Sequence, residues 1–326
     1  MLEFEKAPYL ELENYKAPKG INCIFIPMPD GKKVRLAFWK IAGTEKKCNG
    51  TVLLQQGHNE FIEKYYETIQ EFIDRNFNVV AFDWRGQGMS ERMIEDIHKQ
   101  YIEDFKIHDK DLQFIIEEII FKFFEPPVIA IGHSMGGCIV LSSLKYSGKK
   151  FEKIILSAPM LGFKNEKFLM PLIDVCNLIF SKERYMLWSK PNMGKEVKFE
   201  NNDLTNDLKR YTRTLELVRK RKDIRLWGVT IAFSIAVKKR LIDLRKKGWA
   251  ENIDNKILFI NSLNDRVVSP KHIIEMSKRL PNSKVITFNS CQHEIFMERD
   301  IYRNEMWRKI DYFLELSLDN HSLASR

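Results

Sequence analysis

Glycine and proline are scarce in this sequence, which has 15 glycines and 11 prolines among 326 residues. Collagen-like and linker-rich architectures need far larger shares of both, so the composition excludes them. Intrinsic disorder is excluded too, because 44% of the residues are hydrophobic and 12% are aromatic. This length and composition predict one or two domains with a large apolar core.

Cysteine is rare as well. The five cysteines are too few and odd in number for a disulfide framework, and without a C-x-x-C pair they indicate neither a zinc site nor a redox motif. We therefore expect buried, reduced thiols, as in proteins of a reducing compartment. The sequence predicts neither a metal ion nor an organic cofactor.

Long apolar runs and a basic leader are missing. The first residues carry acids where a signal peptide would need a basic start. The longest uncharged apolar run, 226–237, has twelve residues, whereas a membrane-spanning helix needs about 18 or more. We expect no membrane-spanning segment and a cytoplasmic location, with peripheral contact at the inner face of the membrane.

Positive charge is concentrated in one segment. Residues 181–248 contain 19 lysines and arginines against 8 acids, a net +11, while the other residues sum to −2. This shift predicts a separate module with its own electrostatic role, such as contact with an anionic membrane. The sequence carries no helix-turn-helix, zinc-finger or RNA-binding signature, so we do not expect a nucleic-acid partner.

Short apolar runs alternate with longer amphipathic stretches along the rest of the chain. This alternation predicts an α/β fold with a mostly parallel, doubly wound sheet, opened by an antiparallel pair across a turn at 29–31. The predicted strands are 22–28, 34–41, 51–55, 78–82, 128–131, 153–156, 256–260 and 284–288. The predicted helices are 61–75, 104–124, 135–146, 270–280 and 301–318.

The basic segment falls between two predicted strands of this sheet, 153–156 and 256–260. It contains two predicted helices, 203–221 and 227–244, and no convincing strand. We therefore predict a core of residues 1–159 and 249–326, with residues 160–248 inserted as a helical lid over one edge of the sheet.

The sharpest motif is a G-x-S-x-G pattern formed by Gly132, Ser134 and Gly136. An apolar strand-like run precedes it, and a helix-compatible run follows it. This context predicts a strained strand-to-helix turn in which the glycines prevent side-chain clashes. The Ser134 hydroxyl would lie at the carboxyl end of the sheet, with the positive end of the next helix directed at a developing oxyanion.

A serine nucleophile needs a base, and the base needs an orienting carboxylate. Among the seven histidines, His293 is placed best, in the loop after the last predicted strand. Asp265 lies between Ser134 and His293 in the chain and follows the strand 256–260, as the acid of such a triad should. We expect His133 to point away from the turn, and His108 to lie in an exposed, charged region.

Two backbone amides should bind the oxyanion. One belongs to Met135, the residue after the nucleophile, and the other to His58 in the loop after strand 51–55, where Gly57 permits a sharp turn. Glu60 is expected to brace this loop or to cap the next helix. We interpret Asp83 as structural, holding its loop through Arg85.

Taken in chain order, these motifs resemble the α/β-hydrolase superfamily, within it the monoacylglycerol lipase and bacterial lysophospholipase branch of serine-aminopeptidase-like hydrolases. The matching stretches, spread over about residues 21–316, are 56–60, 61–65, 83–90, 132–137, 265–268 and 292–294. The resemblance implies an α/β-hydrolase fold and a triad of Ser134, Asp265 and His293. Gln56 stands where monoacylglycerol lipases usually carry histidine, which favours the lysophospholipase side.

The resulting prediction is a serine carboxylester hydrolase that cleaves the acyl ester of a lysophospholipid or monoacylglycerol through an acyl-enzyme on Ser134. The apolar stretches 168–180 and 226–237 would line an acyl channel in the lid. Two alternatives remain: an aminopeptidase or amidase on the same fold, and a non-catalytic, membrane-associated binding module. The basic lid disfavours a cationic amino terminus as substrate. The sequence does not specify the oligomeric state.

Overall fold

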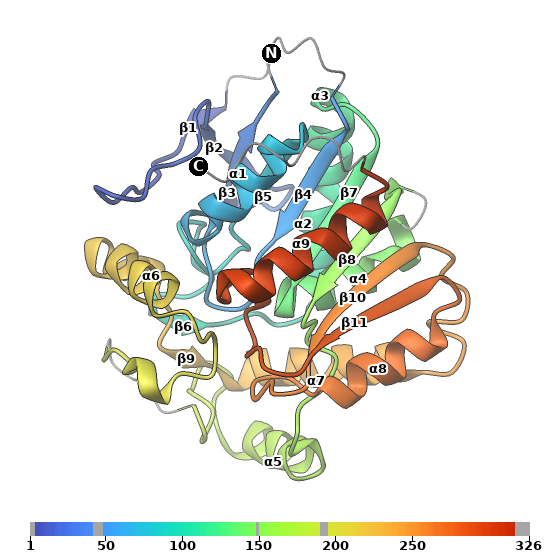
Figure 1. Cartoon of the computed structure of the whole chain (residues 1–326). Coiled ribbons are helices and arrows are strands. Elements are labelled where there is room, and N and C mark those ends of the chain that lie inside the picture. Colours follow the sequence, from blue (N-terminus) through green and yellow to red (C-terminus); the bar gives the residue numbers. More distant parts are fainter. Residues whose placement is uncertain (1–3, 42–47, 148–149, 190–194, 317–326) are drawn as a thin grey trace.

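The computed structural model describes residues 4–41, 48–147, 150–189 and 195–316. Within these residues a nine-stranded sheet crosses the molecule in the order β1-β2-β3-β5-β4-β7-β8-β10-β11 (Figure 1). The pairs β1–β2, β2–β3 and β3–β5 are antiparallel. All neighbouring pairs from β5 to β11 are parallel. The predicted mostly parallel sheet is therefore confirmed.

All eight predicted strands are present. The strands of this sheet are β1 (Glu5–Lys6), β2 (Asn22–Pro27), β3 (Lys33–Trp39), β4 (Thr51–Gln55), β5 (Asn78–Phe82), β7 (Val128–His133), β8 (Lys153–Ser157), β10 (Lys256–Ser262) and β11 (Ser283–Phe288). Strands β4, β5, β7 and β8 are buried along their whole length. Uninterrupted burial explains why these runs lack polar alternation: helices cover both faces.

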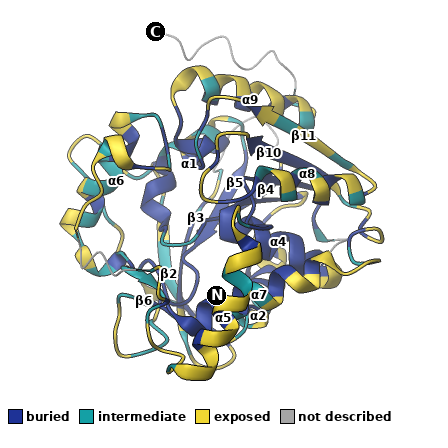
Figure 2. Ribbon diagram, turned by 90° about the horizontal axis from the view of Figure 1, so that it is seen from below, coloured by how far each residue is buried: buried dark blue, intermediate teal, exposed yellow. Residues whose placement is uncertain are grey.

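Helices pack on both faces of the sheet. Helices α1 (Tyr66–Asp74) and α9 (Asp300–Leu314) contribute to one apolar core, whereas α2 (Lys106–Ile115), α4 (Ser134–Ser147) and α8 (Pro270–Arg279) contribute to the other. After α2 the chain continues through a π-helical turn (Ile116–Ile120) into the short α3 (Phe121–Phe123). Figure 2 shows the buried strands enclosed by helices whose outer faces are exposed.

Among the described residues of 160–248, three α-helices lie between β8 and β10: α5 (Glu166–Ile179), α6 (Leu208–Lys220) and α7 (Ile231–Arg245). The sequence predicted α6 and α7 but not α5. The prediction that this segment lacks strands was nearly right, because β9 (Gly228–Val229) is only two residues long and pairs with β6 (Lys99–Gln100). The segment gathers at one end of the sheet. In Figure 1, α5 and α7 lie below the sheet.

Two further expectations concerned buried thiols and the lack of a membrane-spanning segment. All five cysteines are free, but only Cys138, Cys176 and Cys291 are buried, while Cys23 and Cys48 are half-buried. Among the described residues, no helix is both long and apolar enough to cross a bilayer.

Candidate active site

Ser134 lies where β7 ends and α4 begins. Its φ of +49° is in the left-handed region, a strained conformation for a residue with a side chain. The flanking glycines make this turn possible: a Cβ on Gly132 would lie 2.6 Å from the Cα of Gly137, and one on Gly136 would lie 2.4 Å from the carbonyl oxygen of Gln56. The expected strand-turn-helix geometry is therefore present, and it holds the Ser134 hydroxyl at the carboxyl end of β7.

His293 bridges Ser134 and Asp265. Its Nε2 is 2.9 Å from Ser134 Oγ, and its Nδ1 is 2.7 Å from Asp265 Oδ2. Asp265 in turn accepts hydrogen bonds at Oδ1 from the amides of Val267 and Val268, at 2.8 and 2.9 Å. The structure thus brings together three residues that are far apart in the sequence, in the order predicted from it.

These contacts set the direction of the hydrogen bonds. A carboxylate can only accept, so Nδ1 donates to Asp265 and Nε2 is left to accept the Ser134 hydroxyl proton. All three side chains are nearly inaccessible, with Ser134 7% exposed, His293 3% and Asp265 0%. The arrangement can therefore deprotonate the serine as it attacks a carbonyl carbon.

The loop after β4 lies directly against the nucleophile. A Cβ on Gly57 would be 3.1 Å from Ser134 Cβ, a tight contact that would push the loop and the serine apart by a few tenths of an ångström. Glu60 Oε2 braces the loop by accepting hydrogen bonds from the Gly57 amide at 2.5 Å and the Tyr65 hydroxyl at 2.8 Å. Gln87 Nε2 holds the Gly57 carbonyl at 2.8 Å. The loop is rigid where it would supply an oxyanion donor, the role predicted for the His58 amide.

The side chain of His58 is half-buried, and its Nε2 is shielded from solvent. Its ring lies 5.4 Å from the ring of Phe233, and burial lowers the pKa of His58 to about 4. A neutral imidazole at this position adds no charge to the site.

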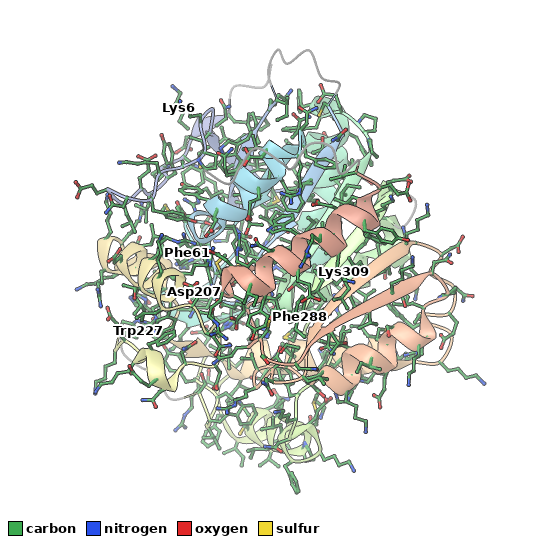
Figure 3. The ribbon with its side chains drawn as sticks, viewed as in Figure 1. Lys6, Phe61, Asp207, Trp227, Phe288 and Lys309 are labelled. Carbon is green, nitrogen blue, oxygen red and sulfur yellow. The ribbon has the colours of Figure 1, made fainter. Side chains whose placement is uncertain are left out.

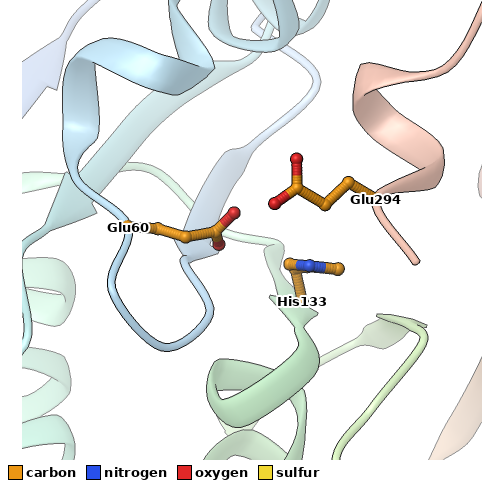
Figure 4. Close-up of side chains that lie close together, drawn as sticks. All are labelled: Glu60, His133 and Glu294. Atoms are coloured by element: carbon orange, nitrogen blue, oxygen red, sulfur yellow. The ribbon is translucent and has the colours of Figure 1, made fainter. Parts of the chain in front are cut away.

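A buried cluster of ionisable side chains adjoins His293, and Figure 4 shows three of its members, Glu60, His133 and Glu294. Glu60, His133 and Glu294 bring one possible metal-ligand atom each within 4.8 Å of one another. The Lys64 ammonium already bonds both carboxylates, at 2.7 Å to Glu60 and 2.5 Å to Glu294. The carboxylates thus have a protein cation as partner, and their charge does not require a metal ion.

Lys64 acts on the pKa of both carboxyls, although burial, only partly offset by Lys64, still raises the pKa of Glu294. Burial would raise the pKa of Glu60, but Lys64 and its other partners lower it to about 2. Burial would likewise lower the pKa of Lys64, yet the two carboxylates hold it above its ordinary value. Because Glu294 follows His293 and Glu60 holds Gly57, the Lys64 ion pairs connect the histidine loop to the loop after β4.

Three expectations about single residues need correction. His133 does not point away: its ring lies 4.8 Å from that of His293, and its Nδ1 bonds the Ser157 carbonyl at 3.1 Å. His108 is fully buried, because α2 turns this position toward the core. Asp83 is structural, but it bonds Arg35, whereas Arg85 bonds Asp30 and Asp111.

Two cavities meet at Ser134 and His58. The first, of about 400 Å³, carries more charged and polar side chains than the second and reaches α6 past His293, Arg210 and Arg225; we call it the polar cavity. The second, of about 220 Å³, is apolar and is lined mainly by α5 and α7, including Met170, Ile173, Phe233 and Val237. A substrate with one apolar and one polar part could therefore place the bond between them at the Ser134 hydroxyl.

Sequence reasoning missed the Lys64–Glu60–Glu294 cluster, although its signals were visible. Glu294 adjoins His293, and Lys64 lies four residues after Glu60 on the turn that opens α1. A lysine and two glutamates in stretches that otherwise become buried point to mutual neutralisation, because isolated buried charges are costly.

Known proteins are similar to this chain in sequence. The chain is 24% identical over 290 residues to a probable lysophospholipase L2 of Haemophilus influenzae, covering 87% of this chain and 90% of that protein. It is 28% identical over 157 residues to the monoglyceride lipase of Rattus norvegicus, covering 48% and 46% of the two chains.

Solved structures agree on the fold. A soluble variant of the Saccharomyces cerevisiae monoglyceride lipase, at 17% identity, superposes with a TM-score of 0.73 over 93% of this chain and 99% of that one. The α/β-hydrolase fold predicted from the sequence is thereby confirmed. The family model for serine aminopeptidase, S33, matches residues 46–300, and the chain therefore belongs to this family of hydrolases.

Proposed function

We propose that this hydrolase is a serine carboxylester hydrolase that cleaves the acyl ester of a single-chain lipid, a lysophospholipid or monoacylglycerol. The observation that carries the proposal is the hydrogen-bonded series Asp265–His293–Ser134 at the meeting point of a polar and an apolar cavity. The lipase and lysophospholipase names of its relatives support the same substrate class.

In this proposal, Ser134 Oγ attacks the ester carbonyl while its proton moves to His293 Nε2. Asp265 holds the imidazole and stabilises its positive charge, and the amides of Met135 and His58 bind the oxyanion. His293 then protonates the leaving glycerol oxygen. Water enters, loses a proton to His293 and releases the fatty acid, which restores the Ser134 hydroxyl.

We further propose that residues 160–248 act as a lid that accepts the acyl chain and contacts an anionic membrane. The inner face of α5 lines the apolar cavity, while its outer face exposes Phe168, Val175 and Leu178. Exposed lysines at 164, 167 and 182 flank this helix. Apolar side chains beside basic ones suit the negatively charged cytoplasmic leaflet, which is the location we propose for the enzyme.

The polar cavity favours an ester over the amino terminus of a peptide. An aminopeptidase needs a carboxylate free to bind the substrate ammonium. The carboxylates among the described residues of this cavity are Glu60 and Glu294, both bonded to Lys64, and Asp203, which lies 3.5 Å from Arg266. A non-catalytic binding module would have no use for the aligned triad.

The test is Ser134→Ala. Hydrolysis of lysophosphatidylethanolamine, monoacylglycerol and p-nitrophenyl esters should fall by about 10³-fold or more, with an unchanged circular dichroism spectrum. Ser143→Ala on the same helix is the matched control and should remain active, because its hydroxyl donates to the Val140 carbonyl and accepts from the Ser147 hydroxyl, and bonds no residue of the triad. Full activity of Ser134→Ala, or cleavage of aminoacyl nitroanilides alone, would refute the proposal. Labelling of the wild type by a fluorophosphonate separates an enzyme from a binding module.

A further inference from the structure

The cations of the polar cavity differ in what they bind. Among the described residues that line it, these cations are Lys64, Arg210 and Arg225. Lys64 is bonded to Glu60 and Glu294, and Arg210 pairs with the carboxylates of residues 67, 207 and 300. Both charges are therefore neutralised within the protein.

Arg225 is different. Within the described part of the chain, its side chain has no ion pair at contact distance, and its Nη1 is buried without a hydrogen-bond partner. Glu196 interacts electrostatically with Arg225, but both of its carboxylate oxygens are bonded to Arg219, at 2.6 and 2.5 Å. A buried guanidinium nitrogen without an acceptor is costly, so this position is suited to a partner that the protein itself does not supply.

The backbone holds Arg225 beside the catalytic loop. The next residue, Leu226, exchanges two hydrogen bonds with the Asn59 side chain, of 2.7 Å at its amide and 3.1 Å at its carbonyl. The Arg225 carbonyl bonds His98 Nδ1 at 2.9 Å, and the His98 ring stacks on Trp227 at 3.9 Å. Trp227 lies on the α6 side of the molecule (Figure 3). Arg225 is thus fixed next to the loop that carries His58.

We propose that Arg225 binds the phosphate of a lysophospholipid head group and makes the enzyme prefer such substrates to monoacylglycerols. This inference rests on the proposed function and narrows its substrate class. With the acyl chain in the apolar cavity and the ester at Ser134, the glycerol and phosphate extend into the cavity that Arg225 lines. A guanidinium binds phosphate oxygens through two parallel N–H donors, whereas a monoacylglycerol offers only hydroxyls. A neutral substrate leaves Nη1 without a charged partner, and this penalty generates selectivity.

The test compares two substrates with the same acyl chain, 1-lauroyl lysophosphatidylethanolamine and 1-lauroylglycerol, presented in neutral detergent micelles. In Arg225→Gln, we expect kcat/KM for the lysophospholipid to fall about tenfold or more, and that for the monoacylglycerol to stay within about twofold. Arg225→Lys should recover part of the loss. Lys222→Gln, an exposed position three residues away, removes the same charge and should change neither rate.

The outcomes separate the two proposals. Equal losses on both substrates, or no loss on either, would overturn the role of Arg225 and leave the ester hydrolase standing. A folded wild type that cleaves neither ester would refute the proposed function, and with it this inference. Competition by glycerophosphoethanolamine for p-nitrophenyl butyrate hydrolysis gives a second readout. Inhibition by glycerophosphoethanolamine should be present in the wild type and absent in Arg225→Gln. If inorganic phosphate alone inhibits equally well, recognition of a head group is refuted.

Discussion

At the scale of single residues, the site depends on groups that are held in costly states. Ser134 has a positive φ, and Glu60, Lys64 and Glu294 are ionisable groups removed from water. Such states persist only where surrounding contacts leave no alternative. The close approaches at Gly57 and Gly136 and the two ion pairs of Lys64 supply those contacts.

Lys64 gives a direct test of this dependence. Lys64→Met leaves Glu60 and Glu294 buried without a cation, so the free energy of unfolding should fall by about 3–5 kcal/mol. The loop after β4 and the His293 loop should loosen together. We therefore expect the variant to show a larger fall in kcat than rise in KM. Urea unfolding and ester kinetics would measure both effects.

The matched control is Lys122→Met. Lys122 pairs with Glu118 on the surface, so its loss should cost at most about 0.5 kcal/mol and leave activity unchanged. Equal destabilisation by the two variants would mean that the buried ion pairs do not hold the active-site loops.

The same residues show what the sequence could predict. The proximity of Ser134, Asp265 and His293 was predictable because each follows a strand and their chain order matches a known arrangement. Lys64, His108 and Arg225 were not, because a charge or an imidazole in the sequence does not reveal which way its element turns it. Even Asp83, rightly interpreted as structural, bonds Arg35 on β3 rather than the nearby Arg85, since strand pairing places Arg35 closer.

At the scale of elements, prediction succeeded where one periodicity dominated. The buried strands and α4 have clear apolar patterns, whereas α5 is apolar on nearly all sides and carries Pro171 inside the helix. The two faces of α5 lie in different environments, which the apolar sequence does not reveal. One face packs on Ile231 and Met186 around Ile173 and Cys176, and the other is exposed.

The exposed face of α5 carries a prediction of its own. Phe168 and Leu178 are 81% and 84% exposed, and neither lines the apolar cavity. In the double variant Phe168→Glu, Leu178→Glu, binding to phosphatidylglycerol vesicles should weaken about tenfold or more, because apolar contacts are lost and two negative charges are added. Cosedimentation with vesicles would measure the change.

Hydrolysis of a soluble short-chain ester should stay within about twofold in this double variant, since the cavity is untouched. Ile301→Glu on α9, at a position 71% exposed, is the control and should bind vesicles more strongly than the double variant. If all three proteins bind alike, α5 is not the membrane-contacting helix.

At the scale of the whole molecule, much of the basic charge of residues 181–248 is used internally. Arg210 and Arg213 bind Glu67 at the start of α1, and Arg240 binds Asp109 on α2. These pairs fasten the inserted segment to the core, and they leave only part of the +11 to face solvent. The sequence reveals the excess of charge but not how it is divided between docking and internal pairing.

The response of folding stability to acid is also a property of the whole molecule. Burial lowers the pKa of His58 and of His133 to about 4, and burial, assisted by Arg85 and Arg240, lowers that of His108 to about 3. In the unfolded chain, histidine takes up its proton near pH 6.5. Between pH 6.5 and 4, the unfolded state therefore binds more protons than the native state, and the free energy of unfolding falls as the pH falls.

Each of these histidines should cost about 2 kcal/mol of stability at pH 5 relative to pH 8. Asp111 acts in the opposite direction, because burial, only partly offset by Arg85, raises its pKa to about 6, so its stabilising contribution is lost as the pH rises. Glu71, Asp83, Asp109 and Glu294 act as Asp111 does, because burial raises their pKa values too, whereas Glu60 and Glu67, whose pKa values are lowered to about 2, act with the histidines. Urea unfolding of the wild type between pH 8 and pH 5 therefore measures the sum of these opposing contributions, and a single variant isolates that of one histidine.

His108→Phe isolates one of these contributions. The ring of His108 packs edge-on against Trp84 and Phe105, and neither of its nitrogens has a hydrogen-bond partner among the described residues, so phenylalanine can occupy the site. The stability difference between pH 8 and pH 5 should shrink by about 2 kcal/mol, whatever the variant does to stability at pH 8. An unchanged difference would mean that His108 is protonated in the native state, and that Arg85 and Arg240 on either side tolerate a third buried cation.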